Sequence, residues 1–109
     1  MEPATRDSWQ DIGTPADFAP GSCQVVVVAG REVAVANVDG RLYAIDNVCT
    51  HDGEELASGP IEGDVIICPR HGARFCLRTG AALTPPAYEP VKVHEVRVAN
   101  GRVALRRAS

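Results

Sequence analysis

Two short segments of the chain each pair a cysteine with a histidine. The first reads Cys49-Thr50-His51, and the second reads Cys68-Pro69-Arg70-His71. Thiolates and imidazoles bind zinc, and they also bind the irons of iron–sulfur clusters. Sixteen residues separate His51 from Cys68, enough for a hairpin of two strands that returns the chain to the same end of a sheet. We therefore expect Cys49, His51, Cys68 and His71 to converge on one metal site.

Two kinds of metal centre use this set of ligands. A zinc ion bound by two cysteines and two histidines would only fasten the loops together, whereas a [2Fe-2S] cluster would carry electrons. Zinc modules of this type usually pair C-x-x-C with two later histidines, and each cysteine here has its own histidine instead. The spacing favours the cluster. Colour separates the two, because an iron–sulfur cluster absorbs visible light and zinc does not.

The order C-x-H, a gap of sixteen residues and then C-x-x-H resembles the signature of Rieske iron–sulfur proteins. Pro69 and Gly72 flank the second pair as they do in that family. The segment HGARFCLRTGAALTPPAYEP, residues 71–90, is similar to the stretch after the second histidine in the ferredoxins that serve bacterial aromatic-ring-hydroxylating dioxygenases. The resemblance covers roughly residues 25–105. It implies that the four residues bind one [2Fe-2S] cluster.

The resemblance also implies a function. Such a ferredoxin is a one-electron carrier that accepts electrons from an FAD-containing ferredoxin reductase and passes them to a terminal oxygenase, an aromatic-ring dioxygenase. We expect no catalytic site in the chain itself, because His94 alone remains outside the two motifs and mononuclear non-haem iron needs two histidines and a carboxylate. The alternative is the Rieske-type small subunit of an assimilatory nitrite reductase, which has the same motif.

Mixed ligation raises the reduction potential. Two thiolates on one iron and two neutral imidazoles on the other leave the oxidised cluster formally neutral, so Rieske potentials lie at about −150 to +300 mV against roughly −400 mV for plant-type clusters. High-potential respiratory members of the family carry a disulfide at the positions of Glu54 and Arg70, and hydroxyl donors at those of Ala73 and Phe75. Because this chain lacks both, we expect a potential near the low end, about −150 mV.

The remaining residues of interest have simpler interpretations. Cys23 and Cys76 lie in apolar runs and are expected to be buried as small hydrophobic side chains. His94 alternates with valines and is expected at a half-exposed strand position, while Trp9 is expected to pack in the core or at a sheet edge. A set of charged residues near the two motifs is expected to form a solvated rim, with docking of redox partners as the alternative. These residues are Asp46, Asp52, Glu54, Glu55, Arg70 and Arg74.

Length and composition fit one globular domain over residues 1–109, with 45% hydrophobic residues and a net charge of −3. The longest apolar run, residues 25–29, is far shorter than the roughly 20 residues that cross a bilayer. Lysine and arginine form no long basic run, which argues against nucleic acid as a partner. The first residues resemble no signal peptide. We therefore expect a cytoplasmic monomer without a membrane partner.

Short runs rich in Val, Ile and Leu, separated by Gly, Pro, Asn and Asp, predict an all-β fold. With the family resemblance, we expect a small antiparallel sandwich or barrel-like Rieske fold with the cluster-binding loops at about residues 46–77. Ala29-Gly30, Asp39-Gly40 and Asn100-Gly101 predict tight hairpin turns, and Thr14-Pro15 predicts the start of a helical turn. The predicted strands are Cys23–Ala29, Glu32–Asn37, Arg41–Asp46, Val65–Cys68, Arg74–Leu77, Val91–Ala99 and Arg102–Arg106.

Overall fold

The computed structural model describes residues 9–50, 53–70, 72–85 and 87–107. Within them the chain forms strands β1 Gln10–Gly13, β2 Cys23–Val28, β3 Arg31–Val38, β4 Arg41–Asp46, β5 Ile61–Glu62, β6 Val65–Ile67, β7 Arg74–Cys76, β8 Val93–Ala99 and β9 Arg102–Arg106. A single 3-10 turn covers Pro15–Asp17. None of the helical structure in these ranges is long and apolar enough to cross a membrane.

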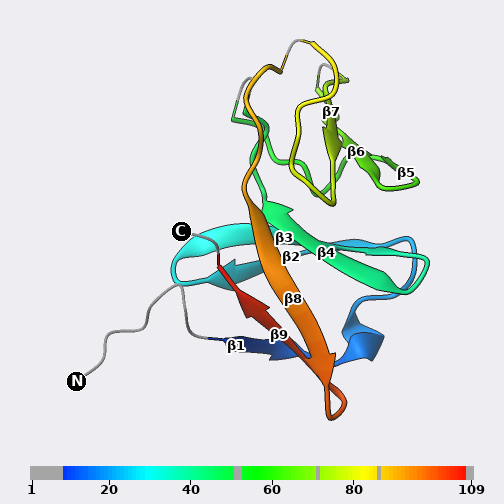
Figure 1. Ribbon diagram of the computed structural model, residues 1–109, viewed down its shortest axis with the longest axis vertical. Helices are drawn as coiled ribbons and strands as arrows, with labels where there is room; N and C mark the ends of the chain where they lie inside the picture. Colours follow the sequence, from blue (N-terminus) through cyan, green and yellow to red (C-terminus); the bar gives the residue numbers. More distant parts are fainter. Residues whose placement is uncertain (1–8, 51–52, 71, 86, 108–109) are drawn as a thin grey trace.

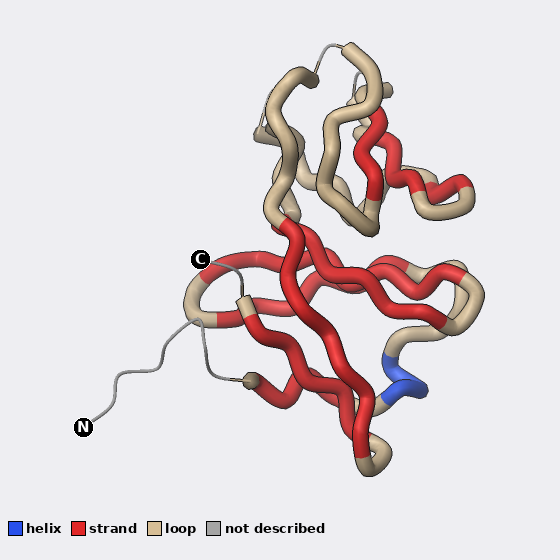
Figure 2. The backbone as a smooth tube through the Cα atoms, in the orientation of Figure 1, coloured by secondary structure: helices blue, strands red, loops and turns tan. Residues whose placement is uncertain are grey.

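The strands form two antiparallel sheets (Figure 1). The larger, called here the base sheet, has the order β1-β9-β8-β4-β3-β2, and the smaller has the order β5-β6-β7. Residues 47–92, called here the loop region, contain the small sheet and long loops that stand on one side of the base sheet (Figure 2). This region is inserted between β4 and β8, which pair with each other through Ala44–His94 and Ile45–Val93. The chain therefore leaves and re-enters the base sheet at neighbouring strands.

The predicted turns are all present. Ala29, Asp39 and Asn100 have φ values of 52°, 53° and 54°, and each precedes a glycine with positive φ. Two successive residues with positive φ are typical of the type I′ turn, whose twist matches that of paired strands. The predicted helical turn is present as the 3-10 turn Pro15–Asp17.

All seven predicted strands are present, with ends within two residues of the prediction. The prediction missed β1 and β5, which lie at the edges of their sheets. β5 has two residues, and β1 has four with an irregularity between Asp11 and Gly13. Strands this short form because a longer neighbour offers backbone partners, so local sequence carries little signal for them.

The side chains of β3 and β4 alternate between two cores. The core of the base sheet contains Phe18, Val28, Val33, Val35, Ala44, Val103 and Leu105. The core under the loop region contains Ala34, Ala36, Ile45, Cys49, Leu56, Ile66, Cys68, Ala73, Phe75, Leu77, Ala87 and Val91. β3 is thus buried on both faces, which explains its continuous apolar sequence. The small side chains of Ala34 and Ala36 leave room for the loop region to pack against the sheet.

Candidate metal centre

Cys49 begins a tight turn three residues after β4. Its N–H donates to the carbonyl oxygen of Glu54 at 2.6 Å, and its own carbonyl accepts from the N–H of Gly53 at 2.8 Å. Gly53 has φ 78°, a conformation that glycine adopts without steric cost. Cys49 is 1% exposed and belongs to the core under the loop region. The turn therefore presents a thiol to the interior of that region.

Cys68 begins a second turn with the same pattern of bonds. Its N–H donates to the carbonyl of Ala73 at 2.7 Å, and its carbonyl accepts from the N–H of Gly72 at 3.0 Å. Gly72 has φ 77°. Cys68 is also 1% exposed and lies in the same core as Cys49. The structure therefore brings the two predicted cysteine ligands together in equivalent local geometry.

The two predicted histidine ligands, His51 and His71, lie outside the described residues. So does Asp52, one member of the predicted charged rim. Each histidine falls inside one of the two cysteine turns in the sequence, between the cysteine and the glycine that closes the turn.

A third turn of the same kind starts at Cys76. Cys76 N–H donates to Ala81 O at 3.0 Å, Gly80 N–H donates to Cys76 O at 2.7 Å, and Gly80 has φ 79°. Hydrogen bonding by the Thr79 side chain, aided by nearby backbone N–H groups, lowers the pKa of the Cys76 thiol despite its burial. Cys76 is buried, as predicted. The turn alone does not predict a ligand: the Cys49 and Cys68 turns each contain a histidine in the sequence, and this third turn contains none.

Asn47 joins the two ends of the loop that contains the Cys49 turn, called here the first loop. Its side-chain Oδ1 accepts from the N–H groups of Leu56 and Ala57, both at 2.9 Å, and its Nδ2 donates to Glu32 Oε1 at 3.0 Å. Asn47 is buried, so these bonds satisfy polar groups that water does not reach. Sequence analysis missed this residue. An asparagine directly after a buried strand, at the start of a loop, is the signal that points to it.

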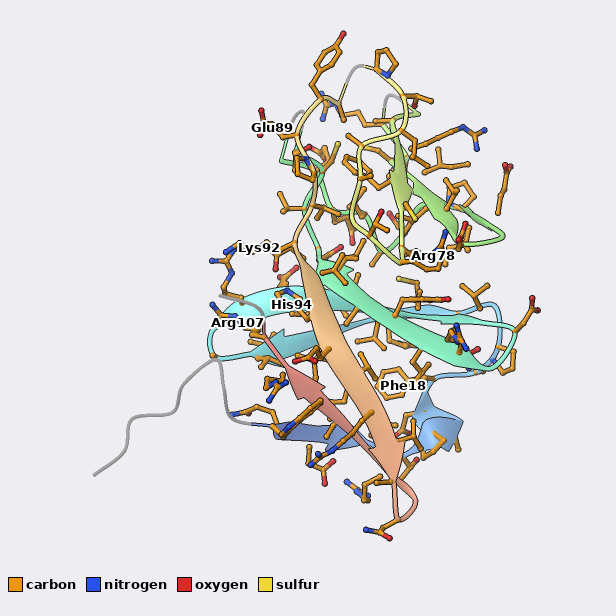
Figure 3. The ribbon with its side chains drawn as sticks, in the orientation of Figure 1. Phe18, Arg78, Glu89, Lys92, His94 and Arg107 are labelled. Carbon is orange, nitrogen blue, oxygen red and sulfur yellow. The ribbon has the colours of Figure 1, made fainter. Side chains whose placement is uncertain are left out.

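A network of side-chain bonds around the buried carboxylate of Asp46 lies at the neck, where the loop region joins β4 and β8. Asp46 Oδ1 lies 2.7 Å from His94 Nε2, and Asp46 Oδ2 accepts from Arg31 at 3.2 Å. Asp46 N–H donates to the carbonyl of Lys92 at 3.0 Å. Figure 3 shows Lys92 and His94 at the start of β8, beside the foot of the loop region. The neck is therefore held by both backbone and side-chain bonds.

The structure corrects two predictions at this neck. His94 is 4% exposed rather than half-exposed, and Asp46 is 6% exposed rather than part of a solvated rim. His94 lies opposite Ala44 and Asp46 lies opposite Val33, so both side chains are on the face of the sheet that carries the core of the base sheet. The alternation of residues within one strand does not show which of its two faces is covered. Burial of the carboxylate is compensated by two charged or polar partners, as such groups require.

The other described members of the predicted rim lie at the surface, and several are paired. Arg70 Nη1 lies 3.0 Å from Glu54 Oε2, and Arg74 Nη1 lies 3.1 Å from Glu62 Oε1. Glu55 is exposed. Trp9 is half-buried beside the base sheet, with the guanidinium groups of Arg97 and Arg106 at 4.2 and 4.8 Å from its ring, which agrees with edge packing.

The two buried cysteines fit a metal cluster. Neither forms a disulfide, both lie in one core, and both are held by equivalent turns. A buried thiolate is costly unless a cation neutralises it, and two ferric ions do so in a [2Fe-2S] cluster. The model of the Rieske [2Fe-2S] domain family matches residues 8–95.

The chain belongs to the Rieske [2Fe-2S] domain family. It therefore carries one [2Fe-2S] cluster, and the zinc alternative is set aside. The Rieske chain is 38% identical to the ferredoxin component of the naphthalene 1,2-dioxygenase/salicylate 5-hydroxylase systems of Ralstonia sp, over 91% of this chain and 95% of that protein. It is 40% identical to the biphenyl dioxygenase ferredoxin subunit of Pseudomonas sp. (strain KKS102), over 82% of each.

A solved structure has the same fold. It is a chain from the complex of reduced oxygenase and oxidised ferredoxin in carbazole 1,9a-dioxygenase, with a TM-score of 0.87 and 33% identity. The likeness covers 94% of this chain and 98% of that one. The predicted all-β, barrel-like Rieske fold is therefore confirmed.

Proposed function

We propose that this Rieske protein is the electron carrier of an aromatic-ring dioxygenase system. It takes one electron at a time from an FAD-containing ferredoxin reductase and delivers it to a terminal oxygenase. The observation that carries this proposal is the pair of buried thiols in equivalent turns, in a chain related over nearly its whole length to ferredoxin components of dioxygenase systems. No observation here favours the nitrite reductase alternative.

We assign Cys49, His51, Cys68 and His71 as the cluster ligands. Cys49 and Cys68 supply the two thiolates from inside the core, and the two histidines follow them at the C-x-H and C-x-x-H spacing. The bound cluster supplies reversible one-electron transfer. Mixed ligation places the potential within the range for such centres, about −150 to +300 mV. We expect the low end, about −150 mV, because the positions of the disulfide and hydroxyl donors of high-potential members hold Glu54, Arg70, Ala73 and Phe75 here.

The chain's own residues hold this centre in place. Backbone N–H groups and glycines at positive φ fix the two turns, Asn47 closes the first loop, and the buried network around Asp46 fixes the neck. Fixed surroundings suit electron transfer, because groups that are already oriented need little rearrangement when the charge of the cluster changes. The thiol side is enclosed in the hydrophobic core, which keeps water from the thiolates.

We further propose that the chain acts as a single domain, residues 1–109, and as a monomer in the cytoplasm. The four cysteines, all among the described residues, form no disulfide, which agrees with a reducing compartment. Transient electron-transfer contacts are small and are steered by charge. Exposed Glu55 near the first turn is a candidate for that steering.

Reconstituted electron flow tests this function. The purified holoprotein is mixed anaerobically with a ferredoxin reductase and NADH, and then with a terminal oxygenase, its aromatic substrate and oxygen. We expect the visible absorbance to bleach in the first step and to recover in the second with formation of hydroxylated product. Reduction without re-oxidation by any aromatic-ring oxygenase would contradict the proposal. Co-purification with a sirohaem protein would support the nitrite reductase alternative instead.

A further inference from the structure

One ion pair joins the two ligand turns directly. Arg70 Nη1 lies 3.0 Å from Glu54 Oε2, in a bond that spans sixteen residues of sequence. Glu54 is the residue whose carbonyl oxygen receives the N–H of Cys49. Arg70 lies inside the second turn, between Cys68 and the Gly72 whose N–H binds the carbonyl of Cys68. The pair thus connects the hydrogen-bonded turn at Cys49 to the hydrogen-bonded turn at Cys68.

We propose that the Glu54–Arg70 pair is a clamp that positions the two ligand turns relative to each other and keeps them closed over the cluster. The inference rests on the proposed ligand set. The backbone bonds of each turn span four or five residues, so they shape each turn but do not fix the distance between turns. The hydrophobic core fixes the inner side of the two turns, whereas the ion pair acts at the exposed side.

The pair is exposed, so its effect must be sought in a local measurement. The side chains of Arg70 and Glu54 are 59% and 46% exposed, and exposed pairs contribute little to global stability. Separation of two loops is a local opening, however, and it needs far less free energy than unfolding. A clamp of this kind changes the opening equilibrium by about two- to fivefold, which corresponds to roughly 0.4 to 1 kcal/mol.

The loop region offers a matched control pair. Arg78 Nε lies 2.7 Å from Asp64 Oδ2, and their side chains are 57% and 39% exposed. Asp64 lies in the turn between β5 and β6, and Arg78 lies in the turn after β7. Neither segment contains a proposed ligand. This pair therefore matches the clamp in chemistry, exposure and region, but it does not join the ligand turns.

The first experiment measures loss of the cluster from the holoprotein to an iron chelator, followed by visible absorbance. In low salt we expect Glu54→Gln and Arg70→Gln each to lose the cluster two to five times faster than the wild type. The swapped variant, Glu54→Arg with Arg70→Glu, restores the attraction and should recover most of the wild-type rate. The control variants Asp64→Asn and Arg78→Gln should leave the rate unchanged. In 1 M salt the difference between wild type and single variants should shrink, because the Debye length falls to about 3 Å.

The second experiment measures the reduction potential. A pair that only added to the stability of the fold would leave this potential unchanged. Glu54→Gln combined with Arg70→Gln leaves the net charge unaltered, so a shift reports the surroundings of the cluster. Opened turns admit water, and water stabilises the extra negative charge of the reduced cluster. We therefore expect a more positive midpoint potential in this double variant and a return towards the wild-type value in the swapped variant.

Several outcomes would overturn the clamp. They are an unchanged rate of cluster loss in the single variants, equal acceleration in the control variants, no recovery in the swapped variant, or a midpoint that does not rise in the double variant. Failure of the proposed ligand set has a different signature. The wild type itself would then lack the visible spectrum of a [2Fe-2S] cluster, or Cys49→Ala and Cys68→Ala would retain it.

Discussion

The base sheet and the loop region are built in different ways. Most strands of the base sheet have five to eight residues and long, regular registers. The strands of the loop region have two or three residues. Paired backbone therefore accounts for much of the order in the base sheet, while the loop region depends on turns, side-chain bonds and the core it shares with β3 and β4.

The two cores also differ in composition. Two of the buried residues in the core of the loop region are the proposed cysteine ligands, Cys49 and Cys68. The buried residues in the core of the base sheet are all aliphatic or aromatic, and none is a cysteine. With the proposed ligands, the cluster completes the core under the loop region, whereas the core of the base sheet is formed by its side chains alone. Substitutions in the two regions should separate these contributions.

The largest expected effect comes from Cys68→Ala. It removes a proposed ligand, so we expect complete loss of visible absorbance and of bound iron. Hydrogen exchange should increase throughout residues 53–85 while β2, β3 and β4 keep their protection. Cys76→Ala, at an equivalent turn without a histidine, is the control and should keep the colour. Loss of protection throughout the base sheet would show that the two regions do not differ in this way.

A matched pair of leucines tests the two cores. Leu77 and Leu105 are both fully buried, the first under the loop region and the second in the base sheet. Each change to alanine should lower the free energy of unfolding by about 3 kcal/mol. We expect Leu77→Ala to speed cluster loss to a chelator strongly and Leu105→Ala to affect it little. Similar acceleration by both would mean that the cores act as one unit.

A smaller effect is expected from a glycine that has no room for a side chain. A Cβ at Gly59 would lie 1.8 Å from the carbonyl oxygen of Ile67, which precedes Cys68. Gly59→Ala must therefore shift the backbone beside the second ligand turn, and we expect a cost of about 2 kcal/mol in urea unfolding. Gly63, at φ +61° with open space around it, serves as control. Gly63→Asn should cost well under about 1 kcal/mol, because asparagine tolerates this conformation.

The smallest effect concerns Cys23, a base-sheet residue that packs against the core of the loop region. Burial, with the charge of Glu55 as a second cause, raises the pKa of the Cys23 thiol from 9.0 to about 11. The contribution of this protonated thiol is fully present below pH 9 and is lost as the pH rises from 9 to 11, because the unfolded thiol ionises first.

Urea unfolding at pH 8 and pH 10.5 measures this contribution. We expect the wild type to lose about 1 kcal/mol more than Cys23→Ala between the two pH values. An equal loss in both proteins would mean that water reaches the thiol, and that the boundary between base sheet and loop region is open there.

Much of the fold was predictable because its signals are local. Ala29-Gly30, Asp39-Gly40 and Asn100-Gly101 specify turns through their own backbone preferences, and the strands they connect follow from short apolar runs. The prediction missed β1 because its partner strand is distant in sequence, with Gln10 opposite Leu105, and it missed β5 because two residues are too few to show a strand pattern. Cys76 shows a signal that the prediction overlooked, because a glycine follows it at the fourth position, as one follows Cys49 and Cys68, and the three turns have the same pattern of bonds.

The chemistry of the proposed metal centre could be predicted from residue types and their spacing. The type and spacing of two cysteines and two histidines restrict the metal centre, because ligand identity decides which metals bind and at what potential. The side chains that hold the surrounding loops in place became visible only in the folded structure. Burial of His94 against Asp46, closure of the first loop by Asn47 and the pairing of Glu54 with Arg70 all join residues at least nine apart in sequence. The folded backbone creates such contacts, and no local pattern of residues encodes them.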